Sequence, residues 1–233
     1  MLGVYNYTVW LTYASLISAV SGIFVAMHGS GHPYIATFLL MFCGLCDAFD
    51  GKVARMKKDR TDFDRRFGIQ VDSLADIVAF GVLPACIGES MLRIYPKIEE
   101  IPHLIKSKDY ISSGKTIIVL AILIFYVLAA LIRLAYFNVM EEERSSKEGG
   151  VLKCYTGVPV TASALVFPMV MLLQYALPAD LTLIYFGLMM VMGFAFVSKV
   201  KVPKPGLRGI LILVGIGVVE ALILLFFHDG INA

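Results

Sequence analysis

Four aspartates, Asp47, Asp50, Asp72 and Asp76, occur within otherwise apolar stretches of the sequence. A charged side chain inside a membrane-spanning segment costs about 3 kcal/mol or more at the bilayer centre, so such residues usually have a function. Four neighbouring carboxylates would also repel one another strongly, and bound cations would remove that repulsion. Because oxygen ligands suit Mg²⁺ and Mn²⁺, the aspartates predict a divalent-metal site, with two ions expected, for a phosphate-bearing substrate.

The spacing of the four aspartates places them on two helical faces. Asp47 and Asp50 are three residues apart, and Asp72 and Asp76 are four apart, so each pair lies on one side of its helix. A short basic loop joins the two segments, which allows the helices to run antiparallel beside each other. This arrangement would point all four carboxylates into one site.

Three small residues share these faces: Gly51 and Ala54 follow Asp50, and Gly68 precedes Asp72 by about one turn. Small side chains let a flat or bulky ligand approach the helix backbone, which predicts a ligand surface beside the metal. The alternative is close packing between helices through small residues. The coincidence of three such residues with the aspartate faces favours the ligand surface.

The composition indicates which elements position these faces. Of the 233 residues, 58% are hydrophobic and 16% are charged, and the mean hydropathy is +0.79, which excludes an ordinary soluble protein. Apolar runs of about 20 residues match the length of membrane-spanning helices. They predict an all-α polytopic membrane bundle of six to seven helices, forming one domain over 1–233, with spans near 8–28, 34–56, 68–92, 116–140, 157–177, 179–198 and 208–227.

Basic residues cluster in the loops after the second and sixth predicted spans, and the positive-inside rule puts both loops in the cytoplasm. The chain would then start inside and end outside, with the aspartates near the cytoplasmic face. The loop over about 93–115 is also basic and would lie outside, against the rule. A net charge of +2 gives no indication of nucleic acid binding.

A long motif surrounds the aspartates. The sequence D-A-F-D-G-K-V-A-R over 47–55, followed after twelve residues by G-I-Q-V-D-S-L-A-D over 68–76, resembles the signature of the CDP-alcohol phosphotransferase family. The connecting loop is longer than in the commonest form of that signature. Three further segments, 72–85, 133–138 and 155–164, resemble the branch of the family that forms phosphatidylserine.

The resemblance extends over about residues 12–165 and implies a catalytic core over 12–200. The last predicted helix, near 208–227, lies beyond the six spans usual in the family. The resemblance further implies an integral enzyme of the cytoplasmic membrane of a prokaryote, acting as a homodimer. Its reaction would transfer the phosphatidyl group of CDP-diacylglycerol to the hydroxyl of L-serine, releasing CMP.

By the same resemblance, Asp47, Asp50 and Asp72 hold metal, while Asp76 both holds metal and acts as the general base. Arg133 would grip the serine carboxylate or the lipid phosphate through its planar fork of donors, or would pair internally with the aspartates. Asn138, in the same motif as Arg133, is assigned to the acceptor and phosphate side. The residues expected to bind the CDP-lipid are Ser15, Ser18, Gly51, Ala54, Arg55 and Gly68.

Alternatives remain for some of these assignments. Arg55 lies at a helix end and could instead extend to lipid headgroups. Ser15 and Ser18 follow Thr12 at intervals of three, a polar stripe that resembles the family only in chemistry and spacing. The acceptor could be inositol, inositol phosphate or glycerol 3-phosphate. A cation-coupled transporter is a distant alternative, since transporter sites also contain intramembrane carboxylates.

Overall fold

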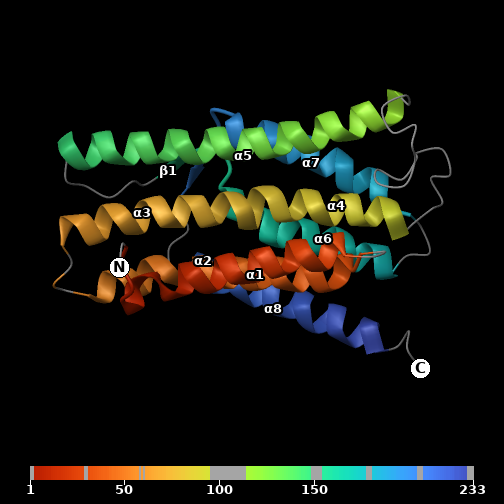
Figure 1. The fold of residues 1–233 in the computed structure, drawn as a ribbon, viewed down its shortest axis with the longest axis horizontal. Coiled ribbons are helices and arrows are strands. Elements are labelled where there is room, and N and C mark those ends of the chain that lie inside the picture. Colours follow the sequence, from red (N-terminus) through yellow and green to blue (C-terminus); the bar gives the residue numbers. More distant parts are fainter. Residues whose placement is uncertain are drawn as a thin grey trace.

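The computed structural model describes residues 3–28, 31–57, 59, 61–94, 114–147, 154–176, 180–203 and 207–229. Within these ranges the chain forms a helical bundle (Figure 1). The α-helices are α1 (Trp10–Met27), α2 (Pro33–Met56), α3 (Asp62–Asp76), α4 (Leu83–Ile94), α5 (Gly114–Lys147), α6 (Ser163–Ala176), α7 (Thr182–Val197) and α8 (Leu207–Asp229).

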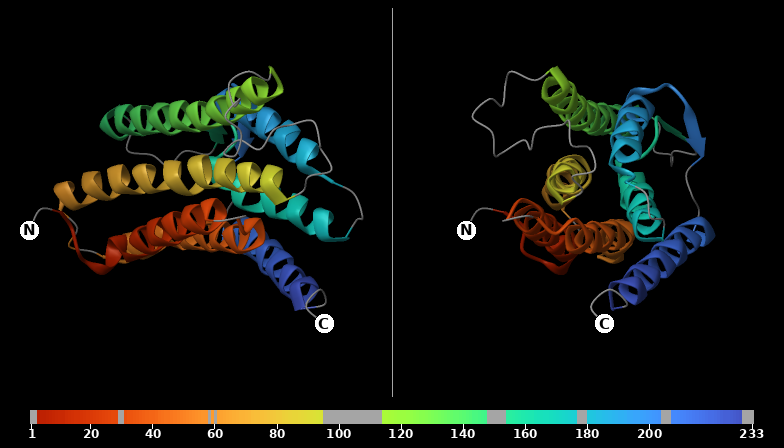
Figure 2. Two further views of the ribbon diagram at one scale, coloured as in Figure 1. Left: turned by 45° about the vertical axis from the view of Figure 1, so that its right-hand side comes forward. Right: turned by 90° about the vertical axis from the view of Figure 1, so that its right-hand side faces the viewer.

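Helices α3 and α4 are two parts of one long helix, joined by the π-helix η2 (Ile77–Val82). Viewed along the bundle, this long helix lies between α1 and α2 on one side and α5 on the other (Figure 2). Helices α6 and α7 pack beside it, and α8 diverges from the bundle towards the C-terminus (Figure 1). The long central helix therefore contacts the elements that carry most of the predicted site residues.

The all-α membrane fold is confirmed. Four helical segments are long and apolar enough to cross a membrane, the longest being Asp62–Ile94. Three shorter apolar helices, Val160–Gln174, Thr182–Val197 and Leu211–Ile223, accompany them. Large hydrophobic side chains such as Phe24, Ile132 and Leu222 lie exposed on the outside of the bundle. In a bilayer these side chains would contact lipid, so their exposure is not costly.

Aromatic side chains fill the interior between α5, α6 and α7. Tyr126, Phe167, Tyr185 and Phe196 are all fully buried. Tyr126 meets Phe167 edge-on at 5.7 Å between ring centroids, and Phe167 lies 4.7 Å from Tyr185. Aromatic pairs at such separations attract beyond the effect of their buried area. This cluster fixes α5 against α6 and α7.

At the end of the bundle opposite the aspartates, a buried ion pair joins α4 to α1. Glu89 Oε2 lies 2.7 Å from the Arg93 guanidinium, which also donates to the backbone carbonyls of Ala26 and Met27 at the end of α1. The Arg93 guanidinium thus lies beside the last carbonyls of α1, where positive charge is favourable.

The boundaries of three helices differ from the prediction: α6 begins at Ser163 rather than near 157, and α3 and α5 are longer than expected. Helix α3 begins at Asp62 rather than near 68, because Thr61 and Asp64 form a reciprocal capping box. Helix α5 continues to Lys147 rather than ending near 140. Both helices therefore extend beyond the apolar runs from which the spans were predicted, at the same end of the bundle (Figure 1).

A short antiparallel pairing of β1 (Cys154–Thr156) with β2 (Lys201–Pro203) was not predicted. Three residues per strand give no periodic signal, and the pairing depends on a contact between segments more than 40 residues apart. It links the chain before α6 to the chain after α7. Most of the predicted loop over 93–115 lies outside the described residues.

Candidate active site

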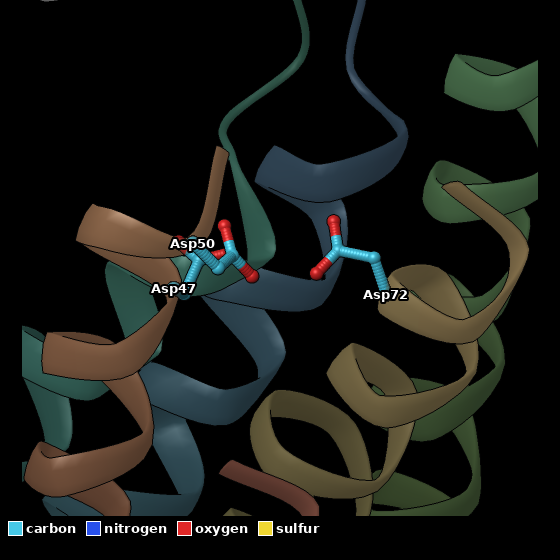
Figure 3. Close-up of side chains that lie close together, drawn as sticks. All are labelled: Asp47, Asp50 and Asp72. Carbon is cyan, nitrogen blue, oxygen red and sulfur yellow. The ribbon is translucent and has the colours of Figure 1, made fainter. Parts of the chain in front are cut away.

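Three of the four predicted aspartates come together. Asp47 and Asp50 project from α2 and Asp72 from α3, and their carboxylates point towards one another (Figure 3). One carboxylate oxygen from each residue lies within 4.8 Å of the other two. All three side chains are partly buried. The spacing of the aspartates along the sequence correctly predicted this meeting of two helices.

Asp76 lies one turn beyond Asp72 on the same face of α3 and is buried. It is not a member of the three-residue cluster, but its carboxyl interacts electrostatically with Asp47, Asp50 and Asp72. The π-helix η2 starts at the next residue, Ile77. Asp76 is thus placed deeper in the bundle than the other three.

The donor set suits a hard divalent cation. Asp47, Asp50 and Asp72 offer carboxylate oxygens alone, and each is held on a helix rather than a loop. Mg²⁺ and Mn²⁺ prefer oxygen ligands and leave positions free for water and phosphate. Three partly buried carboxylates this close together also need positive charge to offset their repulsion. The three-aspartate cluster therefore could hold a metal ion.

The small residues flank this cluster. Gly51 and Gly68 are only partly buried, so the packing of α2 and α3 leaves part of their surface accessible. Ala54, one turn after Asp50 on α2, is 9% exposed. Their role in binding the CDP-lipid stays a prediction, although open backbone at the two glycines is what a close ligand approach requires.

Helix α1 closes one side of the cluster. The hydroxyl of Thr12 donates to Asp50 Oδ2 at 3.4 Å, so Thr12 contacts a predicted metal ligand. The hydroxyl of Ser18 donates to the Leu39 carbonyl at 3.0 Å, and the backbone carbonyl of Ser15 accepts from the Cys43 thiol at 3.2 Å. Both serines are buried at the α1–α2 contact. A role for them in lipid binding stays a prediction.

Thr12 was not among the predicted site residues. The signal for it was its position three residues before Ser15 in the polar stripe of the first helix. The partner of that stripe could not be inferred, because the contact with Asp50 joins residues 38 positions apart and depends on how α1 packs on α2.

Helix α5 supplies Arg133 from the other side. The side chain is 9% exposed, and its guanidinium lies over the ring of Phe137 at 5.0 Å from the centroid. It also interacts electrostatically with the carboxyl groups of Asp47 and Asp76. Arg133 is therefore near enough to interact with two of the four aspartates, and its role in binding a substrate stays a prediction.

Asn138 contacts α3 directly. Its side-chain nitrogen donates to the Ser73 hydroxyl oxygen at 2.8 Å, and the two side chains join α5 to α3 beside Asp72. Asn138 was predicted on the acceptor side, and its visible partner is a protein residue. A direct contact with an acceptor stays a prediction. Arg55 lies in the last turn of α2, but its side chain is outside the described residues.

Comparison with known proteins places this site in a family. The profile described as CDP-alcohol phosphatidyltransferase matches residues 5–198. A CDP-diacylglycerol–serine O-phosphatidyltransferase from Helicobacter pylori strain J99 is 26% identical over 197 residues, covering 83% of this chain and 70% of the relative. The protein of the same description from Saccharomyces cerevisiae is 28% identical over 214 residues, covering 83% and 67%.

An archaetidylserine synthase from Methanothermobacter thermautotrophicus is 31% identical over 151 residues, which cover 64% of this chain and 52% of the relative. The family match spans α1 to α7, and so includes both aspartate-bearing helices, Arg133 and Asn138. The strand β2 and helix α8 lie beyond it. The chain belongs to the CDP-alcohol phosphatidyltransferase family.

Proposed function

We propose that this membrane enzyme transfers the phosphatidyl group of CDP-diacylglycerol to the hydroxyl of L-serine, forming phosphatidylserine and releasing CMP. The observation that carries the proposal is the cluster of Asp47, Asp50 and Asp72 within the family match. Serine is favoured as acceptor because relatives from a bacterium, a yeast and an archaeon all have names that include it.

The position of the cluster suits a lipid substrate with a charged headgroup. Asp47 lies nine residues before Met56, the last residue of α2, which corresponds to about 14 Å along the helix. Basic residues follow in the loop between α2 and α3. With this end facing the cytoplasm of a prokaryotic cell, the site would receive a CDP headgroup while the lipid tails stay in the membrane.

Asp47, Asp50 and Asp72 would hold the first divalent ion, Mg²⁺ or Mn²⁺, and Asp76 would extend the ligand set towards a second. When bound, the metal supplies positive charge that offsets the pyrophosphate and stabilises CMP as leaving group. The hydroxyl of Thr12, bonded to Asp50, would hold that carboxylate in place from α1.

Asp76 acts as the general base in this proposal. Its carboxylate takes the proton of the serine hydroxyl while the serine oxygen attacks the phosphorus that carries the diacylglycerol. The bond from that phosphorus to the bridging oxygen breaks, and CMP departs with this oxygen. Asp76 is buried one turn beyond Asp72, on the inner side of the three-aspartate cluster, and this position supports its assignment as the base.

Arg133 would bind the carboxylate of serine or the phosphate of the lipid. A buried guanidinium needs anionic partners. The Arg133 guanidinium interacts with Asp47 and Asp76, and the carboxylate or phosphate of a substrate would be a further partner. The remaining residues are assigned to the two substrates. On the side of the CDP-lipid, Gly51, Ala54 and Gly68 would receive the cytidine, and Arg55, Ser15 and Ser18 would bind other parts of this substrate. Asn138 would lie on the side of the acceptor. A homodimer is the proposed assembly.

The direct test is an acceptor panel with the purified protein in detergent. CDP-diacylglycerol and Mn²⁺ or Mg²⁺ are incubated with L-serine, inositol, inositol phosphate or glycerol 3-phosphate in separate reactions, and CMP release is measured. We expect release with serine and none after removal of the metal by a chelator. Release with a different acceptor alone would replace serine in the proposal, and no release with any acceptor would refute the proposed reaction.

A further inference from the structure

The π-helix η2 begins immediately after Asp76 and separates the aspartates from α4. A π-helix bonds residues five apart instead of four, so it holds one more residue than the same stretch of α-helix. One residue corresponds to a rotation of about 100° around the helix axis. The segment η2 therefore sets the angle between the side chains of α3 and those of α4.

That angle matters because α4 is fixed by the core. Leu83, Ile87 and Met91 are all fully buried. If η2 relaxed to an α-helix, this apolar face would stay in the core and α3 would turn instead. Asp72 and Asp76 would then leave the positions in which they face Asp47 and Asp50.

The sequence explains why η2 needs support from outside. Pro84 has no backbone N–H, so it cannot donate to the carbonyl of Phe80, four residues earlier. Phe80 is fully buried, so its carbonyl needs a donor other than the missing Pro84 N–H. Another helix supplies a donor: the hydroxyl of Tyr126 on α5 donates to the Phe80 carbonyl oxygen at 2.7 Å.

The hydroxyl of Ser163 is a weaker candidate for the same carbonyl. It lies 3.5 Å from Phe80 O but only 2.7 Å from Val160 O. A serine hydroxyl has one hydrogen, which goes to the nearer acceptor. Tyr126 is therefore the effective donor. It lies two turns before Arg133 on the same face of α5, so one helix face carries both the support of η2 and the guanidinium beside the aspartates.

We propose that Tyr126 is a positioning residue for the active site, whose hydroxyl holds η2 through the Phe80 carbonyl and so fixes the rotation of Asp72 and Asp76. The expected effect of Tyr126 on turnover rests on the proposed function. Its effect on metal affinity concerns the aspartates themselves and can be measured without turnover.

The chain offers a matched control in Tyr185. Its hydroxyl donates to the Pro84 carbonyl at 2.9 Å, and the residue is as fully buried as Tyr126. Each tyrosine therefore makes one buried hydrogen bond to the backbone of the long helix, but the bond from Tyr185 lies beyond η2. Tyr126→Phe and Tyr185→Phe should lower the melting temperature by similar amounts, since each removes one buried hydrogen bond to the backbone of the long helix.

Only Tyr126→Phe should affect the site. We expect it to weaken Mn²⁺ binding, followed by electron paramagnetic resonance of the purified protein, by about 10-fold, as loss of an indirect contact to a metal ligand does. In turnover, kcat should fall about 10- to 100-fold with little change in the KM for serine, as expected from misplaced reacting groups. Tyr185→Phe should bind Mn²⁺ and turn over as the unmodified protein does.

Pro84→Ala is a second, independent variant. Alanine restores a backbone N–H four residues after Phe80, so that an ordinary α-turn becomes possible. It should weaken Mn²⁺ binding without the loss of stability expected for Tyr126→Phe.

The inference is wrong if Tyr126→Phe and Tyr185→Phe bind Mn²⁺ equally well and turn over equally fast. If the unmodified protein binds Mn²⁺ but releases no CMP, the proposed reaction is refuted. The Mn²⁺ affinities of Tyr126→Phe and Tyr185→Phe would then still test the role of Tyr126.

Discussion

At the scale of single residues, the cluster of Asp47, Asp50 and Asp72 makes the most direct prediction. Asp72→Asn keeps the size of the side chain but removes a charged ligand from α3. Turnover and Mn²⁺ affinity should each fall at least about 100-fold, since loss of an indirect contact alone costs about 10- to 100-fold. CMP release and Mn²⁺ titration measure the two effects.

Asp62→Asn is the matched control for Asp72→Asn. Asp62 lies on the same helix, its side chain is 63% exposed, and its partners are the exposed Arg65 and Arg66. Exposed ion pairs contribute little to stability, so this variant should keep full turnover and Mn²⁺ binding. Equal losses in Asp62→Asn and Asp72→Asn would contradict a specific metal role for Asp72.

The contact of Ser73 with Asn138 gives a second prediction at this scale. Ser73→Ala and Asn138→Ala should each reduce the free energy of unfolding by about 1 kcal/mol, because each removes the same hydrogen bond. The double variant should be little worse than either single one, which is the mark of a direct pair. Additive losses in a denaturation cycle would show that the two side chains act separately.

Residue spacing predicted that Asp47 and Asp50 would meet Asp72, because residues three or four apart share a helix face. Asp76, expected at the same point, lies one turn beyond the cluster. The contacts of Thr12 and Ser73 were not predictable in the same way. Each depends on the rotation and depth of a neighbouring helix, and no residue spacing within one segment contains that information.

At the scale of elements, periodicity located the spans but not the local departures from α-helical geometry. The start of α3 had a signal in Thr61 and Asp64, which form its capping box. For the π-helix η2 the sequence contains only an indirect signal, the position of Pro84. A proline can kink a helix or end it as well as displace its hydrogen bonds, and the outcome here depends on Tyr126 from another helix.

Two buried glutamates on different helices should respond in opposite ways to the same substitution. Glu220 on α8 is 4% exposed and lies against Met169 and Leu172 of α6 in a mostly apolar groove. In the part of the chain that the structure describes, its Oε2 has no hydrogen-bond partner. Glu220→Leu should raise the free energy of unfolding by about 1–3 kcal/mol, because it removes an unsatisfied polar group.

Glu89→Leu is the counterpart on α4. Glu89 pairs with Arg93, so its loss leaves a buried guanidinium without that partner and should destabilise the protein by about 3–5 kcal/mol. Thermal unfolding in detergent measures both variants. A loss of stability in Glu220→Leu would show that the carboxyl has a partner on some other molecule, such as a lipid or a second copy of the chain.

At the scale of the whole molecule, the aspartate cluster, the loop between α2 and α3, and the last turns of α5 lie towards one end of the bundle (Figure 1). The Glu89–Arg93 pair and the end of α1 lie at the other. From the positive-inside rule we propose that the first end faces the cytoplasm, in which case an odd number of spans leaves α8 ending outside. This orientation brings the site to the side where water-soluble serine and CMP are available.

The orientation can be tested by cysteine labelling in intact cells. The four native cysteines, Cys43, Cys46, Cys86 and Cys154, are first replaced. Single cysteines are then introduced by His32→Cys, at the start of α2, and by Asp59→Cys, between α2 and α3, because both positions are exposed and lie at opposite ends of α2. A membrane-impermeant maleimide should label His32→Cys in intact cells and Asp59→Cys only after permeabilisation. The reverse pattern would place the aspartates on the outside, where the proposed supply of CDP-diacylglycerol and serine from the cytoplasm would fail even if the metal chemistry held.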